Sequence, residues 1–352
     1  MSNTMKAIRM YAPRDLRLEQ VPIPEIKENE VLVKIMAVGI CGSDIPRINQ
    51  YGAHISPIIP GHEFSGVIVE TGKDILNFKI DDRVTVPPIL PCFACEFCDH
   101  GHYSLCKNYK YFGSRNDGAF AQYLAVPETN LLKVADHVSF EAAATADPLA
   151  NALHAVERGG FQPGHKVCVF GVGAIGLYAI QYMKAKSASV VVAVDVDDRK
   201  LESARNCGAD FSIDGRSADA AEQVIRVTDG GADICIDASG FPVAQHNAIM
   251  ATAKHGTMVL LGISHQPLTL SEQTVDWVMR GEKAIVGSWN SFSKPFPGWE
   301  WELAVKALSD GTVDAEKVIT HKLPLEEVPG IFEKIYRKEL FFNKVLFLPW
   351  ME

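Results

Sequence analysis

The chain has 352 residues, of which 47% are hydrophobic and 22% are charged, and its net charge is −9 at pH 7. This length exceeds what a single hydrophobic core ordinarily supports, so about two domains are expected. The composition is ordinary for a soluble globular protein. The negative charge argues against binding to nucleic acid or to an anionic membrane, because proteins that bind these polyanions carry a basic surface.

The N-terminal segment MSNTMKAIRM lacks the apolar run of a secretory signal, and no later run is long enough to span a bilayer. We therefore expect a cytoplasmic protein in a reducing compartment. In that setting clustered cysteines, four of the eight in this chain, are more often metal ligands than disulfides.

The first 150 residues predict strands and turns. Apolar and polar residues alternate in several short runs that Gly, Pro and Asp separate. These runs are VLVKIMAVGI (31–40), FSGVIVETG (64–72), DRVTVPP (82–88) and AFAQYLAVP (119–127). The pattern indicates an antiparallel, barrel-like β domain with long loops. It is followed by a segment of helical composition and spacing, residues 141–156.

From residue 166 the pattern becomes strand, glycine turn, helix and strand. Continuous β-branched runs alternate with helical stretches, which predicts a parallel sheet covered on both faces. The runs are VCVF (167–170), SVVVAVD (189–195), ADICIDAS (232–239) and TMVLLG (257–262). The residue pattern changes again near residue 290. The C-terminal segment contains an amphipathic stretch (301–311) and a strand-like end (344–349).

Four cysteines lie within fifteen positions, as C-x2-C-x2-C-x7-C. They are Cys92, Cys95, Cys98 and Cys106. Such a cluster could be a catalytic metal centre, a redox device or a structural staple. Four thiolates fill a tetrahedral zinc and leave no position for substrate, so the set favours a closed structural site.

The segment GVGAIG matches the dinucleotide fingerprint G-x-G-x-x-G. Its glycines are Gly171, Gly173 and Gly176, with Ala174 and Ile175 between the last two. The match follows a buried strand and begins a helix, the context in which a pyrophosphate binds the helix N-terminus. Asp195 ends the next strand, where a carboxylate would accept hydrogen bonds from ribose hydroxyls and repel a 2′-phosphate. NAD(H) is therefore expected over NADP(H), although Arg199 could accept that phosphate.

A second set of potential metal ligands is dispersed along the chain. It comprises Cys41 in GICGSD, His62 and Glu63 in GHEFSG, and Asp147 in ADPLANALHA. A cysteine, a histidine and a carboxylate on separate loops are the usual donors of an open zinc site, which keeps one position for water or substrate.

These motifs together resemble the zinc-dependent medium-chain dehydrogenase/reductase family of alcohol and polyol dehydrogenases, along essentially the whole chain. Segments such as GAHISPIIPGHEFSG and GSWNSFSKPFPGWEWE are most similar to members that act on a polyol phosphate. The resemblance implies an α/β protein with a GroES-like β-barrel catalytic domain, residues 1–150 and 291–352, which includes a zinc lobe at 91–107. A Rossmann NAD-binding domain would occupy residues 151–290.

The resemblance also implies two zinc ions per chain and NAD(H) as cofactor. Cys41, His62 and Asp147 would hold the catalytic zinc, with Glu63 at a ligand or water-bridged position. The four clustered cysteines would hold the structural zinc. Two departures matter: Asp147 replaces a longer glutamate found in many polyol dehydrogenases, and Pro46 stands where relatives often carry a proton-relay histidine.

The expected reaction is oxidation of a secondary hydroxyl of a polyol or polyol phosphate to a ketose. Ser43 is the candidate proton acceptor, although it could be a turn residue that bonds its own backbone. A substrate phosphate would need cations, for which Arg47, His54 and Arg115, then Lys110 and Lys294, are the candidates.

Two alternatives stay open. The first is a dehydrogenase of an unphosphorylated polyol or secondary alcohol, of the sorbitol or butanediol type. The second is a dinucleotide-binding module without turnover. The strand-like segment KAIVGSW (283–289) could pair across a two-fold axis, so a homodimer or homotetramer is expected.

Overall fold

The computed structural model describes residues 3–351. The chain divides into two compact units. Unit 1 comprises Met1–Asp147, Phe292–Asp310 and Ile319–Glu352, and unit 2 comprises Pro148–Ser291 and Gly311–Val318. The division differs from the expected domain boundaries mainly in Gly311–Val318, which groups with unit 2. No helix among the described residues is long and apolar enough to cross a membrane.

Unit 1 is built around a seven-stranded sheet in the order β16-β17-β3-β4-β5-β9, with β8 also paired to β3. Its strands are β3 (Glu30–Gly39), β4 (Glu63–Thr71), β5 (Arg83–Thr85), β8 (Tyr123–Pro127), β9 (Leu132–Lys133), β16 (Ile319–Pro324) and β17 (Lys344–Leu348). Two further pairs are β1 (Thr4–Ala12) with β2 (Asp15–Pro22), and β6 (Ile89–Leu90) with β7 (Lys110–Tyr111). Apolar side chains that alternate along β1, β3 and β4 form one buried core.

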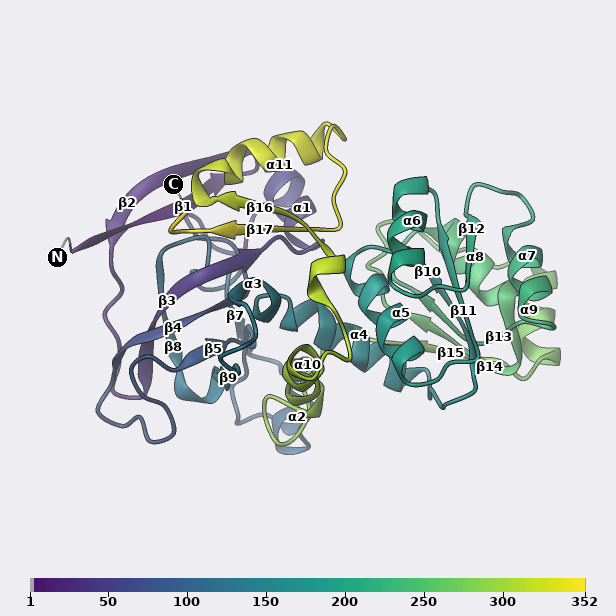
Figure 1. Ribbon diagram of the computed structural model, residues 1–352, viewed down its shortest axis with the longest axis horizontal. Helices are drawn as coiled ribbons and strands as arrows, with labels where there is room; N and C mark the ends of the chain where they lie inside the picture. The colour runs from purple at the N-terminus through teal and green to yellow at the C-terminus, as the bar shows by residue number, and fades with distance from the viewer. Residues whose placement is uncertain (1–2, 352) are drawn as a thin grey trace. The chain divides into compact units, whose positions relative to one another are not determined.

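The tail of the chain completes this sheet. β17 lies beside β3 with Leu346 opposite Gly39, and β3 lies beside β4 with Gly39 opposite Glu63. Both pairings are antiparallel. Residues separated by about 280 positions in sequence are therefore neighbours at the end of β3 (Figure 1).

The helices of unit 1 are short. They are α1 (Asp44–Pro46), α2 (Glu96–Asp99), α3 (Phe140–Ala143), α10 (Trp299–Ser309) and α11 (Val328–Tyr336), and α4 (Ala146–Arg158) begins in this unit. The single helix expected over 141–156 is thus two helices. Pro148 has no amide hydrogen and fits only the first turn of a helix, so a new helix begins just before it.

Unit 2 is the expected doubly wound parallel sheet, with strand order β12-β11-β10-β13-β14-β15. Its strands are β10 (Lys166–Phe170), β11 (Val190–Asp195), β12 (Phe211–Asp214), β13 (Ala232–Asp237), β14 (Thr252–Leu260) and β15 (Ala284–Gly287). Its helices are α5 (Ala174–Ala185), α6 (Asp198–Asn206), α7 (Ala220–Val227), α8 (Pro242–Ala251) and α9 (Glu272–Arg280). Helices α5 and α6 lie on one face of the sheet, and α7, α8 and α9 lie on the other (Figure 1). This is the strand order of dinucleotide-binding folds, which reverses between β10 and β13.

Candidate functional site

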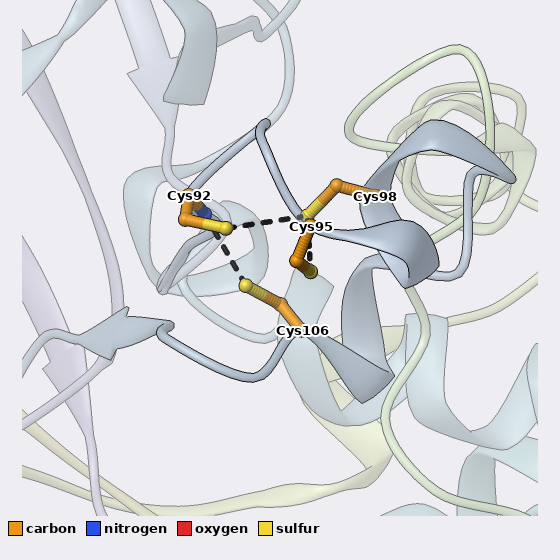
Figure 2. Close-up of side chains that lie close together, drawn as sticks. All are labelled: Cys92, Cys95, Cys98 and Cys106. Carbon is orange, nitrogen blue, oxygen red and sulfur yellow. Dashed lines mark hydrogen bonds between the residues drawn. The ribbon is translucent and has the colours of Figure 1, made fainter.

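The four clustered cysteines converge on one point in unit 1. Their sulfur atoms all lie within 4.8 Å of one another, and all eight cysteines of the chain are free thiols (Figure 2). Sγ of Cys98 lies 3.6 Å from that of Cys95 and 4.0 Å from that of Cys92. A tetrahedral zinc with Zn–S bonds of about 2.3 Å requires S–S separations of about 3.8 Å. The four sulfurs therefore fit a zinc ion.

Backbone amide groups stabilise the thiolate form of one of these four cysteines. Amide groups of Lys107 and Cys98 bond the Cys95 sulfur and lower the pKa of Cys95 to about 6, whereas burial raises the pKa of Cys98 to about 12. A dication bound among the sulfurs would favour the thiolate form of all four. The surroundings therefore suit a metal better than four protonated thiols.

The dispersed ligand candidates also lie close together, where β3 ends and β4 begins. Donor atoms of Cys41, His62 and Glu63 lie within 4.8 Å of one another. Cys41 follows β3, and Glu63 begins β4 directly opposite Gly39, so the strand pairing itself brings the three together. The imidazole of His62 and the carboxyl of Glu63 are almost fully buried. We call Cys41, His62, Glu63 and Asp147 the open cluster.

Asp147 lies near these three residues but not within the same tight group. It is in the first turn of α4 and is buried. Burial raises the pKa of Asp147 to about 7, and the Glu63 carboxylate contributes to the increase. The open cluster thus combines two carboxyl groups, an imidazole and a thiol, which are the donor types of zinc. A bound zinc ion would offset the charge repulsion between the two carboxylates.

Asp44 supports the open cluster through contacts with its members, a role that the sequence analysis missed. Its carboxylate is fully buried, accepts a hydrogen bond from the Cys41 amide at 3.1 Å, and faces His62 Nδ1 at 3.4 Å. Arg47 Nη1 lies 3.1 Å from the same carboxylate. Burial lowers the pKa of His62, but Asp44 and Cys41 raise it more, so that the pKa of His62 lies well above its usual value. With Nδ1 facing Asp44, Nε2 is the nitrogen left for a metal.

A second missed residue is Lys344 in β17. Its Nζ lies 2.5 Å from Glu63 Oε2 and 2.7 Å from the carbonyl oxygen of Ile40, and its side chain is 3% exposed. Burial lowers the pKa of Lys344, but Glu63 and Cys41 raise it more, so the pKa lies above its ordinary value and the amine is charged. The signal in the local sequence for Asp44 is its place three residues after Cys41. Lys344 has no local signal.

The predicted proton acceptor and phosphate ligands lie around the open cluster in unit 1. Ser43 donates its hydroxyl hydrogen bond to Cys41 Sγ at 3.3 Å and does not bond its own backbone as a turn residue would. The guanidinium of Arg115 lies over the ring of Tyr109, 4.8 Å from its centroid. Burial, followed by the nearby cations Arg115 and Arg47, lowers the pKa of His54. Arg47, His54 and Arg115 therefore lie near one another, whereas Lys110 is exposed in β7 and Lys294 is exposed in a loop.

The glycine turn of unit 2 has the geometry of a phosphate-binding turn. Gly171 has φ of +85°, and a Cβ at Gly176 would lie 2.4 Å from the Gly171 carbonyl oxygen, so both positions require glycine. A Cβ at Gly173 would meet no heavy atom within 4 Å among the described residues. Ala174 and Ile175 begin helix α5 immediately after this open position. The first turn of α5 is thus accessible to an anion.

Asp195 ends β11 and is tied to the same turn. Its Oδ2 accepts the Val172 amide at 2.8 Å, and its Oδ1 accepts the Asp197 amide at 3.0 Å. The guanidinium of Arg199 is held by Asp197, with Nε–Oδ1 of 3.0 Å and Nη2–Oδ2 of 2.7 Å. The arginine that could accept a 2′-phosphate therefore already has a carboxylate partner.

Comparison with known proteins agrees with this architecture. The family described as "Alcohol dehydrogenase GroES-like domain" matches residues 27–136, and the one described as "Zinc-binding dehydrogenase" matches residues 174–306. The chain is 36% identical to galactitol 1-phosphate 5-dehydrogenase of Escherichia coli K12, over 98% of this chain and 100% of the relative. It is 32% identical to sorbitol dehydrogenase of Bacillus subtilis, over 98% of this chain and 97% of that enzyme.

A solved structure is also similar to this chain. The crystal structure of galactitol-1-phosphate dehydrogenase from Escherichia coli matches with a TM-score of 0.92 and 35% identity, over 98% of this chain and 100% of that one. The fold expected from sequence, a GroES-like domain with a Rossmann domain, is confirmed. The chain belongs to the zinc-binding dehydrogenases, within the family of medium-chain alcohol and polyol dehydrogenases, and is an oxidoreductase.

Proposed function

We propose that the chain is a zinc-dependent, NAD-linked dehydrogenase that oxidises a secondary hydroxyl of galactitol 1-phosphate to give tagatose 6-phosphate. The observation that carries the proposal is the open cluster, which joins Cys41, His62 and the buried carboxylate of Glu63, with buried Asp147 beside them, in a relative of polyol dehydrogenases. Such a set has three protein donors and one position for substrate. The similarity to galactitol 1-phosphate 5-dehydrogenase supports the substrate.

Cys41, His62 and Asp147 would hold the catalytic zinc, with Glu63 beside them, and Cys92, Cys95, Cys98 and Cys106 would hold a structural zinc. When bound, the catalytic zinc supplies a Lewis acid that acidifies the substrate hydroxyl, and NAD⁺ supplies the hydride acceptor. The side chains of Glu63 and His62 are buried, so bulk water has little access to them. Asp44 keeps the His62 ring oriented throughout.

Ser43 is the residue that we assign to proton removal. Its hydroxyl already contacts Cys41 Sγ, so it lies at the ligand set from which the proton must leave. Pro46 cannot accept a proton, so beyond Ser43 the outward path would use Glu63, the cofactor ribose and water. Arg47, His54 and Arg115 would bind the substrate phosphate, because the two guanidinium cations lie near the His54 imidazole in unit 1. We further propose NAD(H) over NADP(H), from Asp195 and the paired Arg199.

The test is NAD-linked oxidation of galactitol 1-phosphate compared with galactitol, sorbitol and threonine, together with zinc analysis. We expect two zinc ions per chain and the highest kcat/KM with the phosphorylated polyol. A higher kcat/KM with free sorbitol would assign the second candidate function, an unphosphorylated polyol dehydrogenase, which the 32% identity to sorbitol dehydrogenase favours. Zinc binding without oxidation of any polyol would leave only a dinucleotide-binding module.

A further inference from the structure

The open cluster has more donors than a catalytic zinc can use. Donor atoms of Cys41, His62 and Glu63 lie within 4.8 Å of one another, and Asp147, outside that group, is a fourth candidate beside them. Four protein ligands would close a tetrahedral zinc to substrate. An open site therefore requires that one of the four be held back from the metal. This inference rests on the proposed function, since it concerns the zinc assigned to that site.

The contacts of Lys344 single out Glu63. The Glu63 carboxylate is the one donor of the four whose oxygen lies 2.5 Å from a lysine amine. That amine is itself fixed, because it donates a second hydrogen bond to the Ile40 carbonyl at 2.7 Å. Both side chains are almost completely buried, at 3% and 1% exposure. A carboxylate oxygen bonded to a buried ammonium is less available to a metal than the same oxygen would be without that ammonium.

The sheet leaves room for this pair at Gly39. Lys344 lies two residues before Leu346 on β17, so the two side chains point to the same face of the sheet. Leu346 pairs with Gly39, and Gly39 pairs with Glu63, so the lysine must cross β3 to reach the carboxylate. A Cβ at Gly39 would lie 2.6 Å from Glu63 Oε2 and 3.4 Å from Lys344 Cδ. The missing side chain at Gly39 makes the crossing possible.

Charge also favours this arrangement. If Cys41, Glu63 and Asp147 were all ionised around a bound zinc dication, one of the three negative charges would be left uncompensated. The ammonium of Lys344 would compensate it, while Asp44 is separately paired with Arg47. A buried site is stable only when its charges are matched in this way.

We propose that Lys344 is a positioning residue that holds the Glu63 carboxylate away from the catalytic zinc and so keeps the fourth coordination position open for the substrate hydroxyl. Without the lysine amine, Glu63 becomes an additional direct ligand. Metal binding then tightens while turnover falls. If Lys344 had only a structural role, its replacement would weaken metal binding, because loss of a supporting residue ordinarily lowers metal affinity.

The test compares wild-type enzyme with Lys344→Met, Lys344→Arg and Lys344→Met/Glu63→Gln. We expect Lys344→Met to release zinc to a chelator about tenfold more slowly than wild type, to lose at least about tenfold in kcat, and to show altered visible bands after cobalt substitution. Lys344→Arg keeps the cation and restores the wild-type spectrum. The double variant, whose neutral amide is a poor metal ligand, returns the release rate to near that of wild type.

Two controls define the measurement. Subtracting the cobalt spectrum of Cys41→Ala isolates the open cluster from the four-cysteine site. Lys322→Met removes a lysine from the neighbouring strand β16 and should leave spectrum and release rate unchanged. Should Lys344→Met fail to fold, Lys344→Gln supplies a neutral hydrogen-bond donor of similar length, with the same expected changes.

The proposal is overturned if either folded variant without a cation at position 344 releases zinc as fast as wild type or faster, or keeps the wild-type cobalt spectrum. Failure of the proposed function is a separate result. It would show as a Cys41→Ala variant that binds as much metal as wild type, or as absence of polyol oxidation by the wild-type enzyme.

Discussion

At the scale of single residues, the open cluster depends on groups that are not themselves metal ligands. Asp44 joins three parts of it, because one buried carboxylate contacts the Cys41 amide, the His62 ring and the Arg47 guanidinium. It fixes both the position of the thiolate and the orientation of the imidazole. Such supporting groups contribute to metal affinity nearly as strongly as the ligands do.

We therefore predict that Asp44→Ala lowers zinc affinity of the open cluster by about 10- to 100-fold, and that Asp44→Asn, which keeps an oxygen acceptor, lowers it less. Competition with a chromophoric chelator measures the affinity. The four-cysteine site serves as the internal control, because the contacts of Asp44 are with Cys41, Arg47 and His62, and the zinc of the four-cysteine site should be retained in both variants. Equal affinities for wild type and Asp44→Ala would show that the carboxylate serves only charge balance.

At the scale of elements, the turn between β11 and α6 carries the residues to which we assign the proposed preference for NAD(H). Asp197 N-caps α6 through the Arg199 amide and also pairs with the Arg199 side chain. In the proposed function, Asp195 would present its carboxylate to the adenosine ribose. Discrimination against a 2′-phosphate would then have two causes, repulsion by Asp195 and the engagement of Arg199.

Replacing Asp197 by Ala should release Arg199 towards a 2′-phosphate. We expect the ratio of kcat/KM for NADP⁺ to that for NAD⁺ to rise about tenfold, which corresponds to about 1.4 kcal/mol. The gain should disappear in Asp197→Ala/Arg199→Ala. Steady-state kinetics with both cofactors make the comparison, and an unchanged ratio in the single variant would assign the selectivity to Asp195 alone.

The segment before β15 contains a lysine whose charge is unfavourable in the folded protein. Lys283 Nζ bonds the Thr252 carbonyl at 2.5 Å, and burial lowers the pKa of Lys283 from its ordinary value of 10.5 to about 8. Below pH 8 this cost is fully present. Between pH 8 and 10.5 the unfolded chain binds more protons than the folded one, so this group makes the protein more stable as pH rises.

The stability of wild type relative to Lys283→Met should accordingly increase by about 1 to 2 kcal/mol between pH 7.5 and pH 10, after allowance for partial solvent screening. Urea unfolding of both proteins at the two pH values measures it. The variant is its own baseline, because other titrating groups affect both proteins equally. A stability difference that does not change with pH would contradict the lowered pKa.

The four-cysteine lobe is a structural element tied to the segment 292–301 by aromatic contacts. Phe296 lies 5.4 Å from Phe93 and 5.2 Å from Tyr103 between ring centroids, and it stacks at 6.3 Å on Phe292. Phe292 in turn stacks on the buried Trp301 at 5.9 Å. The packing of Trp301 thus depends on a lobe that four thiols hold together.

Cys95→Ser should remove one zinc ion per chain, lower Tm by several degrees and shift tryptophan emission to longer wavelength as the aromatic contacts loosen. Cys41→Ser is the matched control, since it should also lose one zinc ion and abolish turnover, but leave Tm and emission near wild type. Loss of turnover in Cys95→Ser with Tm and emission unchanged would instead give the lobe a direct role in the chemistry.

At the scale of the whole molecule, sequence patterns predict what is local and miss what long-range pairing assembles. The parallel strands of unit 2, the turn at Gly171 and the spacing of Cys92 to Cys106 are all contained in short windows, so the fold class followed from them. The contact of Lys344 with Glu63 spans 281 positions and depends on β17 joining β3. No periodicity in either segment encodes that neighbour, and the same holds for the aromatic contact of Phe296 with Tyr103.

The remaining question at this scale is assembly, which we propose occurs through the edge of the unit 2 sheet. β15 is the last strand of the order β12-β11-β10-β13-β14-β15, and its Ile285 is 38% exposed, with Trp289 just beyond it at 51%. An apolar edge strand with unpaired backbone groups is a template for a second copy related by a two-fold axis. Introducing a charge there is the usual protection against such pairing.

Ile285→Lys should therefore shift the protein from the mass of a dimer or tetramer to a smaller species in light scattering, by opposing like charges across the two-fold axis. Ile263→Lys, at a more exposed apolar site outside β15 (53% against 38%), is the control and should leave the mass unchanged. If Ile285→Lys keeps the wild-type mass, the copies do not meet at this strand. Zinc content should stay at two ions per chain in both variants, because the metal sites lie in unit 1.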